Sequence, residues 1–441
     1  MKRIGLLGVY EWGLLAVLLL IVLHAPFSVA VGSWLPDYAT IIKAWKEIVL
    51  TVLATIAVAS VTRRRAWPIV LRNGLIQLSL AFIVLHVVLA AVLGGDQQSV
   101  VAGLMIDLRF IVMFILMYVL VLLRPESIKR VLAVVAAGAV IVLGFGLLQI
   151  TLLPDDVLRG IGYSRQTITP FTTIDSNPEY VRINSTLRGP NPLGAIAVVY
   201  AALASAYLLK RTRGADMRRI AVVAGGLVAA GAVVFASYSR SAYIALGAAL
   251  GLTIVMTKKV SRSFVLAGMA VFALLIVGLV LVSTTDWYSN VILHEDPEST
   301  VVSKSNDGHI ESFETGAYRA VTQPVGAGVG STGSASLYDD DQANDAIIEN
   351  YYFFVAHESG WLGLTLFIAL FAGVLIELWR RRSGWPALGL FASGIGLALI
   401  GMLLPVWADE TVALIWWGVA GALIAPTSGI IRSSNAKRAR K

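Results

Sequence analysis

The chain has 441 residues, of which 57% are hydrophobic and only 14% are charged, and its mean hydropathy is +0.78. This composition excludes a soluble globular protein and is typical of a helical integral membrane protein. The absence of cysteine excludes disulfides, thiolate catalysis and cysteine-ligated metals. The net charge of +8 could suggest a nucleic-acid partner, but the basic residues follow the pattern of membrane-protein loops, so we expect no nucleic acid.

Apolar segments long enough to cross a bilayer recur along almost the whole chain. The first is too long, and too poorly followed by a cleavage site, for a removable signal peptide. We therefore predict an all-α polytopic membrane protein with a single integral membrane domain, residues 1–441, and about twelve transmembrane helices. The predicted helices lie near residues 10–32, 39–61, 75–93, 100–123, 131–152, 191–209, 219–236, 241–256, 263–283, 351–378, 387–404 and 411–427.

The connections between these helices alternate between basic and non-basic. If the N-terminus is cytoplasmic, every inner connection is basic, and together the inner segments hold most of the 35 Lys and Arg residues. Cytoplasmic loops of membrane proteins carry such an excess. The pattern predicts that both termini are cytoplasmic and that the two long loops, 153–190 and 284–350, are outside.

The second long loop carries a predicted amphipathic helix, residues 307–322. Ile310, Phe313, Ala317 and Ala320 recur at helical spacing and form an apolar stripe that we expect to lie against the membrane spans. Pro324 and the alternating glycines after it end this helix and force an open turn. Ordering a polar loop outside the bilayer costs entropy, so we expect the chemistry to reside in residues 284–350.

Several charged residues fall within predicted spans, where a charge usually faces a polar cavity. Lys46 and Glu47 are expected to neutralise one another, as are Asp107 and Arg109.

On the outer side, Arg240 lies in a polar break between two spans and offers a planar fork that suits phosphate oxygens. The alternative is an arginine whose head extends to the lipid headgroups at a helix end. Arg188 and Arg182, before the sixth span, allow the same two interpretations.

His309 and Glu349 are candidates for acid–base chemistry in the second loop. Glu349 could accept a proton from a sugar hydroxyl, although a carboxylate at a membrane boundary is commonly an interfacial anchor. The alternative for His309 is a solvent-exposed residue without a function. Glu358 follows His357 in the next predicted span, and of the two it is harder to explain as a residue that only packs against other helices. The run Asp339–Asp341 resembles a metal-binding cluster, but a solvated loop is favoured, so we predict neither a metal nor a cofactor.

Together these motifs resemble the O-antigen ligase and O-antigen polymerase superfamily over residues 40–380. The resemblance implies a GT-C-like glycosyltransferase fold and transfer of a glycan from undecaprenyl diphosphate to a glycan or glycolipid acceptor. It also implies a multi-pass protein of the bacterial inner membrane, whose active site faces outward and whose reaction is inverting and metal-independent. The matching residues are Ser239-Arg240-Ser241, Gly308-His309, Pro324-Val-Gly326-Ala-Gly328, Glu349-Asn350, Gly360-Trp-Leu-Gly363, Lys46-Glu47 and Arg188-Gly-Pro-Asn-Pro-Leu-Gly194.

The resemblance also implies roles for these residues. Glu349 would act as the base, assisted by His309, and the donor diphosphate would bind the three arginines. The backbone at Gly326 and Gly328, and the side chain of Asn350, would approach the sugar. Ligases of this superfamily usually carry His directly before that Asn, so Glu349 favours a polymerase. Transporters or flippases of polysaccharide are the alternative class; they need functional charges in mid-span but no long outer loop. A third possibility, a purely structural or receptor membrane protein, leaves the outward arginines unexplained.

Overall fold

The structure, a computed structural model, describes residues 5–174, 177–210, 216–257, 285, 305–338 and 347–426. Within them, nine helical segments are long and apolar enough to cross a membrane, and two further apolar helices are shorter. The nine are α1–η1–α2 (Leu6–Leu20, Ile21–Leu23 and His24–Trp34), α4 (Trp45–Arg63), α6 (Gly74–Val92), α7 (Gln97–Leu123), α8 (Ser127–Thr151), α9 (Pro190–Lys210), α10 (Met217–Ala236), α11 (Arg240–Thr257) and α15 (Tyr351–Arg380). The two shorter ones are α16 (Trp385–Gly401) and α17 (Glu410–Ile424).

Each predicted span that falls on described residues coincides with one of these helices, whereas the predicted span 263–283 lies outside the described residues. The prediction of one continuous helix at 39–61 was wrong. The chain there forms the 3₁₀ turn η2 (Pro36–Tyr38) and a short helix, α3 (Ala39–Lys43), before α4 begins after Ala44. Ala44 breaks the helix because its backbone, at φ −87° and ψ 7°, has left the α-helical region.

Side-chain caps fix where several spans begin. Asn73, Asp96, Asp216, Asn350 and Asp409 precede α6, α7, α10, α15 and α17, and each accepts a backbone N–H from the first turn. A capping oxygen satisfies donors that have no partner within the helix, which matters most where the helix enters a membrane.

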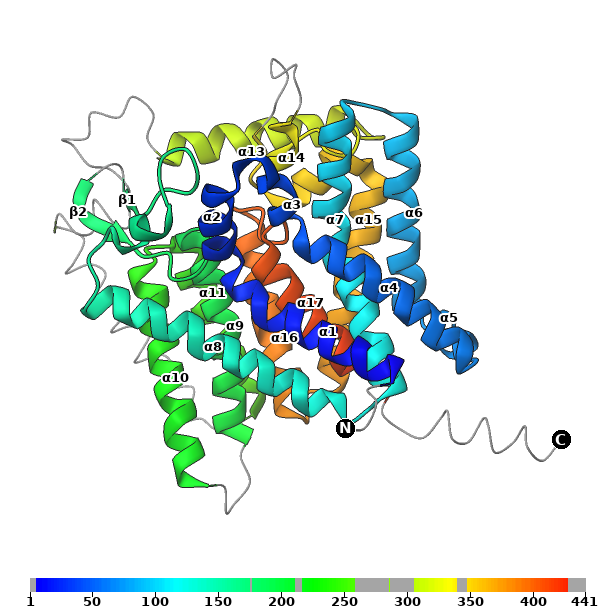
Figure 1. Cartoon of the computed structure of the whole chain (residues 1–441), viewed down its shortest axis with the longest axis horizontal. Coiled ribbons are helices and arrows are strands. Elements are labelled where there is room, and N and C mark those ends of the chain that lie inside the picture. Colours follow the sequence, from blue (N-terminus) through cyan, green and yellow to red (C-terminus); the bar gives the residue numbers. More distant parts are fainter. Residues whose placement is uncertain are drawn as a thin grey trace.

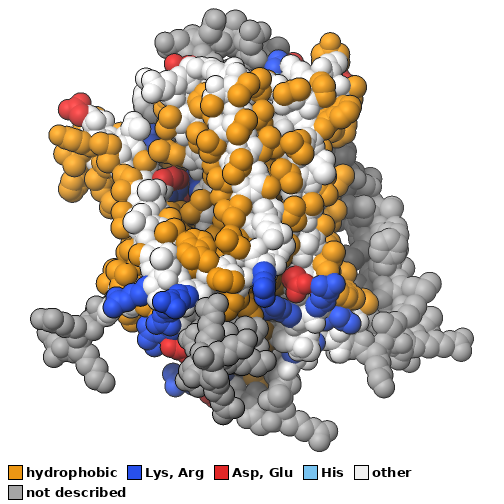
Figure 2. Space-filling view, turned by 90° about the vertical axis from the view of Figure 1, so that its right-hand side faces the viewer, with side chains coloured by type: hydrophobic (Ala, Val, Ile, Leu, Met, Phe, Trp, Pro, Cys, Tyr) orange, Lys and Arg blue, Asp and Glu red, His pale blue; other side chains and the backbone are white. Residues whose placement is uncertain are grey.

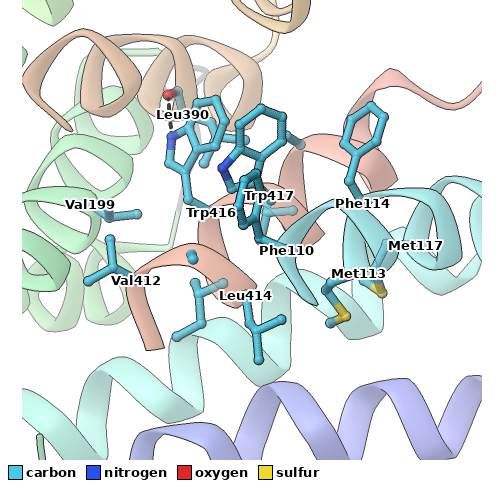
Figure 3. Close-up of a cluster of buried hydrophobic side chains, with 14 of the residues drawn as sticks. Phe110, Met113, Phe114, Met117, Val199, Leu390, Val412, Leu414, Trp416 and Trp417 are labelled. Atoms are coloured by element: carbon cyan, nitrogen blue, oxygen red, sulfur yellow. Dashed lines mark hydrogen bonds between the residues drawn. The ribbon is translucent and has the colours of Figure 1, made fainter. Parts of the chain in front are cut away.

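The core of the bundle forms around α7 and α17. Trp416 and Trp417 of α17 are fully buried, and Trp417 packs against Phe110 and Phe114 of α7 (Figure 3). The indole Nε1 of Trp416 donates to the carbonyl oxygen of Leu390, 3.1 Å away. At Gly421 a Cβ would overlap the carbonyl oxygen of Phe114, so glycine allows α17 to approach α7 closely.

The two ends of the bundle differ in charge. Lys and Arg side chains gather at one end (Figure 2), where the N-terminus and the short helix α5 (Trp67–Leu71) also lie (Figure 1). At this end the fully buried Glu11 of α1 accepts hydrogen bonds from Arg130 and forms an ion pair with Arg124, in each case at 2.7 Å. Glu11 thereby fixes α1 to the connection between α7 and α8.

The long connections lie at the opposite end. The 153–190 connection contains the 3₁₀ turn η3 (Val157–Ile161) and an antiparallel two-stranded sheet of β1 (Thr172–Ile174) and β2 (Asn177–Arg182), which the all-α prediction did not include. In the second connection, α13 (Ser305–Thr322) confirms the predicted helix, and the short α14 (Gly333–Ser336) follows it. α13 runs across the end of the bundle, at the height where α6 ends and α7 begins (Figure 1).

The face that α13 packs against the bundle differs from the predicted stripe. Ile310 and Phe313 are 58% and 49% exposed, whereas Ser312 and Gly316 are buried. The small residues Ser312 and Gly316 allow α13 to lie close to α15. The larger side chains of Ile310 and Phe313 lie beside this contact and remain partly exposed.

Candidate active site

His309 and Glu349 lie side by side at the α13 end of the bundle. Nδ1 of the His309 ring, in the second turn of α13, hydrogen-bonds to Oε2 of Glu349, the residue before the cap of α15. The backbone N–H of Glu349 donates to the Ser312 hydroxyl at 2.8 Å, which ties Glu349 to the same helix. About a third of each side chain is exposed, 33% for His309 and 32% for Glu349, so the pair is open to a ligand.

The contact between α13 and α15 positions this pair. A Cβ on Gly316 would lie 3.0 Å from the side chain of Phe353, so glycine is what permits the close contact. The Phe313 ring packs edge-on against Phe353, with their centroids 5.2 Å apart. α13 therefore rests on the first turn of α15 and carries His309 to Glu349.

Asn350 is explained by helix geometry. Its Oδ1 accepts the backbone N–H groups of Tyr352 and Phe353 at 2.9 and 3.1 Å, and its Nδ2 donates to the carbonyl oxygen of Met402 at 2.8 Å. The side chain is buried and its hydrogen-bonding groups have protein partners. Asn350 thus fixes the start of α15, and with it Glu349, while contact with a sugar stays a prediction.

Arg182 and Arg240 form a neighbouring pair of cations. At the end of β2, Arg182 donates through Nε to the carbonyl oxygen of Ser237 (2.9 Å) and through Nη2 to Asn191 (2.7 Å). Burial lowers the pKa of Arg182 to about 10, and the positive charge of Arg240 contributes to the lowering. The half-buried Arg240 is the first residue of α11. Two guanidinium groups are therefore held within electrostatic range of each other.

A strained turn between α10 and α11 presents Arg240. Tyr238 adopts a left-handed backbone, φ 48°, which is unfavourable for a residue other than glycine. Oγ of Ser237 accepts the backbone N–H of Ser239 at 3.3 Å and stabilises the turn. Gly194 of α9 packs against this region, where a Cβ on Gly194 would lie 2.7 Å from the Cβ of Ala242.

Arg188 lies in a different electrostatic environment. It is exposed in the connection before α9, and its charge acts on His24, Asp409 and Glu410 around the start of α17. The three predicted arginines thus divide into the pair Arg182–Arg240 and a separate Arg188 that faces acidic residues.

The glycine-rich loop after α13 is inserted between α7 and α15. Gly326, Gly328 and Gly330 all have positive φ angles, which favour glycine. A Cβ on Gly326 would lie 2.7 Å from the backbone nitrogen of Gly360, and one on Gly330 would overlap the carbonyl oxygen of Ser99. Packing against protein backbone therefore accounts for Gly326 and Gly330, and an approach of Gly326 or Gly328 to a sugar stays a prediction.

The same loop meets α15 where that helix is broken. Gly360, at φ 66° and ψ −169°, interrupts the helix, and the loop binds the backbone groups that the break releases. Ala327 donates to the carbonyl oxygen of His357 at 2.6 Å, Gly328 to that of Glu358 at 3.2 Å, and Trp361 to that of Pro324 at 2.9 Å. Below the loop, Glu358 Oε1 accepts the N–H of Gly330 at 3.1 Å.

Comparison with known families bears on this arrangement. Residues 225–368 match the family model described as O-antigen ligase. The match covers less than half of the chain, and over these residues the chain is similar to the O-antigen ligase family. The segment that matches the O-antigen ligase family contains Arg240, His309, the glycine-rich loop and Glu349, whereas Arg182 and Arg188 precede it. No curated protein matches the chain.

Part of the polar structure of the bundle was not predicted. Lys46 and Glu47 form the expected ion pair, 3.3 Å apart, but Arg109 pairs with Glu47 at 3.5 Å and with Glu410 at 3.2 Å, not with Asp107. His24 completes the network, with its Nε2 3.5 Å from Glu410. His24 and Glu410 lie 386 positions apart, at the two ends of the sequence, and no local signal connects them.

Asp107 instead faces Glu358. Both carboxyl groups are buried and interact directly, and one oxygen of each has no hydrogen-bond partner among the described residues. Glu358, which packing did not explain in the sequence, therefore connects the glycine-rich loop to α7.

The acidic run Asp339–Asp341 lies outside the described residues. In the part of the chain that the structure describes, no group of three or more acidic or histidine side chains could hold a metal ion. The prediction of a metal-independent reaction stays a prediction.

Proposed function

We propose that this chain is a membrane glycosyltransferase that moves a glycan from an undecaprenyl-diphosphate donor to a sugar hydroxyl of a glycan or glycolipid acceptor. The observation that carries the proposal is the contact of Glu349 with His309, two residues of the family-matching segment, which form a partly exposed acid–base pair. The arginine pair Arg182–Arg240 supplies fixed positive charge for the donor. The use of Glu349 as the base favours a polymerase-type transfer.

In the proposed reaction, the acceptor hydroxyl oxygen attacks the anomeric carbon of the donor sugar. The bond between that carbon and the diphosphate oxygen breaks, and the configuration at the carbon inverts. The second carboxylate oxygen of Glu349, Oε1, takes the hydroxyl proton, while the Nδ1–H of His309 holds Oε2 and orients the group. Undecaprenyl diphosphate leaves with the bonding electrons.

The leaving group develops negative charge and needs a cation rather than an acid. Arg182 and Arg240 carry like charges that act on each other, so an anion that neutralises both stabilises the pair. The planar guanidinium fork matches two phosphate oxygens in a way that an ammonium group does not. The charge of Arg188 already acts on Asp409 and Glu410, so binding of the diphosphate by Arg188 would compete with these two acidic residues.

The charge distribution supports an outward-facing site. The basic end of the bundle corresponds to the cytoplasmic side under the positive-inside rule, and α13 with His309 lies at the other end. We therefore place the reaction at the outer face of the bacterial inner membrane, where the lipid-linked glycan donor would be bound.

The buried charges support an enzyme over a transporter. Lys46 and Arg109 are held by the network at the start of α17, and Asp107 and Glu358 hold the glycine-rich loop. These groups stabilise the elements around the site, whereas a transporter needs charges that are available to a passing substrate.

The test is glycan transfer in proteoliposomes that contain a purified lipid-diphosphate donor. We expect Arg240→Lys to abolish transfer, whereas the control Arg382→Lys, an exposed arginine at the basic end, retains it. EDTA should leave the wild-type rate unchanged. Near-normal turnover of Arg240→Lys would remove the diphosphate role from this residue, and movement of intact donor across the membrane without a new glycosidic bond would establish a flippase.

A further inference from the structure

α13 carries an apolar surface that no described part of the chain covers. Ile310 is 58% exposed, Phe313 49%, Tyr318 70% and Val321 72%. Helical spacing places Ile310, Phe313 and Val321 on one stripe together with Ala317, and this stripe lies beside the face that packs on α15.

The next edge of the same helix is acidic. Asp307, Glu311 and Glu314 are exposed and follow one another at helical spacing. α13 therefore has a packed face, an apolar face and an acidic face. An exposed apolar face beside a charged one is typical of a helix at a membrane interface and not of a helix surrounded by water.

The apolar stripe continues into the lipid-facing surface of a membrane span. The indole Nε1 of Trp361, in α15, donates to the carbonyl oxygen of Ala320 near the end of α13, at 2.7 Å. Trp361 and Leu362 are 56% and 59% exposed, and Val325, just after α13, is 60% exposed. Trp361 directly follows the break in α15 at Gly360, where the uninterrupted part of this span begins, and tryptophan there is typical of the boundary between acyl chains and headgroups. The C-terminal end of α13 is thus fixed at this boundary.

We propose that α13 is an interfacial helix whose apolar stripe, Ile310, Phe313, Ala317 and Val321, is embedded in the acyl chains of the outer leaflet. The axis of α13 runs across the ends of the spans (Figure 1), as an interfacial helix requires, and its acidic edge then faces the headgroups and water. The bilayer is the occupant because the stripe is continuous with the exposed apolar side chains of a span, Trp361 and Leu362.

Immersion of the stripe would set the depth of the catalytic pair. His309 belongs to the same helix, so the bilayer would hold it and Glu349 at headgroup level, where the diphosphate of a polyprenyl lipid lies. This consequence rests on the proposed function, whereas the immersion itself does not.

The chain has no cysteine, so single cysteines can be introduced and spin-labelled without background. We would label Ile310→Cys and Val321→Cys on the stripe and Glu311→Cys and Glu314→Cys on the acidic edge. Val84→Cys on α6, where Val84 is 60% exposed on a span, serves as the lipid reference. Arg159→Cys, in the exposed connection after α8, serves as the water reference.

The measurement is power-saturation electron paramagnetic resonance in vesicles of phosphatidylethanolamine and phosphatidylglycerol, with oxygen as the apolar relaxation agent and a nickel chelate as the polar one. The stripe labels should resemble the Val84 label, accessible to oxygen but not to nickel, and the acidic-edge labels should resemble the Arg159 label. Nickel access at Ile310 and Val321, or access of neither agent, would overturn the proposal by showing water or protein at the stripe. Because no transfer is measured, failure here is separate from failure of the proposed reaction.

Discussion

His309 and Glu349 form a hydrogen-bonded pair although 40 residues separate them in the sequence. The contact depends on α13 crossing the end of the bundle and resting on the first turn of α15. The backbone N–H of Glu349 also donates to the hydroxyl of Ser312, and His309 holds Oε2 of the carboxylate, so Oε1 is the oxygen that can receive a proton. The pair allows the roles of the two residues to be separated.

The first prediction concerns which residue takes the proton. We expect Glu349→Gln to lower the single-turnover rate by roughly 10²-fold or more, the usual contribution of a general base. His309→Ala should lose less, because it removes only the orientation of the carboxylate. Donor binding should be unchanged in Glu349→Gln, since the arginine pair is intact. An active Glu349→Gln together with an inactive His309→Ala would assign the base to His309.

The second prediction concerns the glycine-rich loop. Gly330→Ala should lower both thermal stability and activity, because a Cβ would overlap the carbonyl oxygen of Ser99 and the left-handed backbone (φ 84°) adds about 1–2 kcal/mol of strain. Gly225→Ala, in α10, is the matched control: it has nothing within 4 Å of the new Cβ and should stabilise the helix by roughly 0.5–1 kcal/mol. Equal melting temperatures for the two variants in detergent would refute the tight insertion of the loop.

The third prediction concerns the buried network. Glu410→Ala should destabilise the protein by roughly 3–5 kcal/mol, since it leaves Arg109 buried with a reduced set of partners. Glu377→Ala removes an ion pair with the mostly exposed Arg380 and should cost less than about 1 kcal/mol. Thermal unfolding in detergent compares the two. Arg109 also pairs with Glu47 and donates to the carbonyl oxygen of Ala408, and a small effect of Glu410→Ala would mean that these two partners suffice.

The fourth prediction concerns pH. Burial, followed by the charge of Glu410, raises the pKa of Asp409 to about 6 from an ordinary value of 3.8, although the Val412 N–H, Arg109 and Arg188 act in the opposite direction. The folded protein therefore binds this proton more tightly than the unfolded chain. The contribution of Asp409 to stability is largest below pH 3.8, declines as pH rises to about 6, and is constant above.

Asp409→Asn should remove this decline, because the amide cannot ionise yet still caps α17. Melting temperatures across this pH range test the prediction, with Asp96→Asn, the cap of α7, as the control that should leave the slope unchanged. An unaltered slope in Asp409→Asn would show that another group titrates.

The sequence predicted the elements whose signal is local. Each described span, α13, and the turn at Pro324 follow from apolar length, helical spacing and the conformational limits of proline and glycine. Contacts that depend on packing were not predictable in this way. Arg109 was paired with Asp107 because the two are neighbours along α7, but a helix directs residues two positions apart to different sides, so each finds its partner on another helix.

The orientation of α13 shows a second limit. Helical spacing identified the apolar stripe correctly but not what would cover it, because periodicity does not distinguish protein from lipid. Likewise, Asn350 was a candidate for sugar contact, but its position before a helix is equally that of a cap, and its hydrogen bonds match the cap.

The break in α15 has a consequence for how this region can be exchanged between relatives. The carbonyl groups of His357 and Glu358 accept the N–H groups of Ala327 and Gly328 from the glycine-rich loop. A chimera that takes only α15 from a relative would pair this helix with a glycine-rich loop from a different protein. A chimera that takes residues 323–363 together would keep the loop with the part of α15 that it binds. Recombination between family members should therefore preserve this segment as a single block, even where the flanking spans are freely substituted.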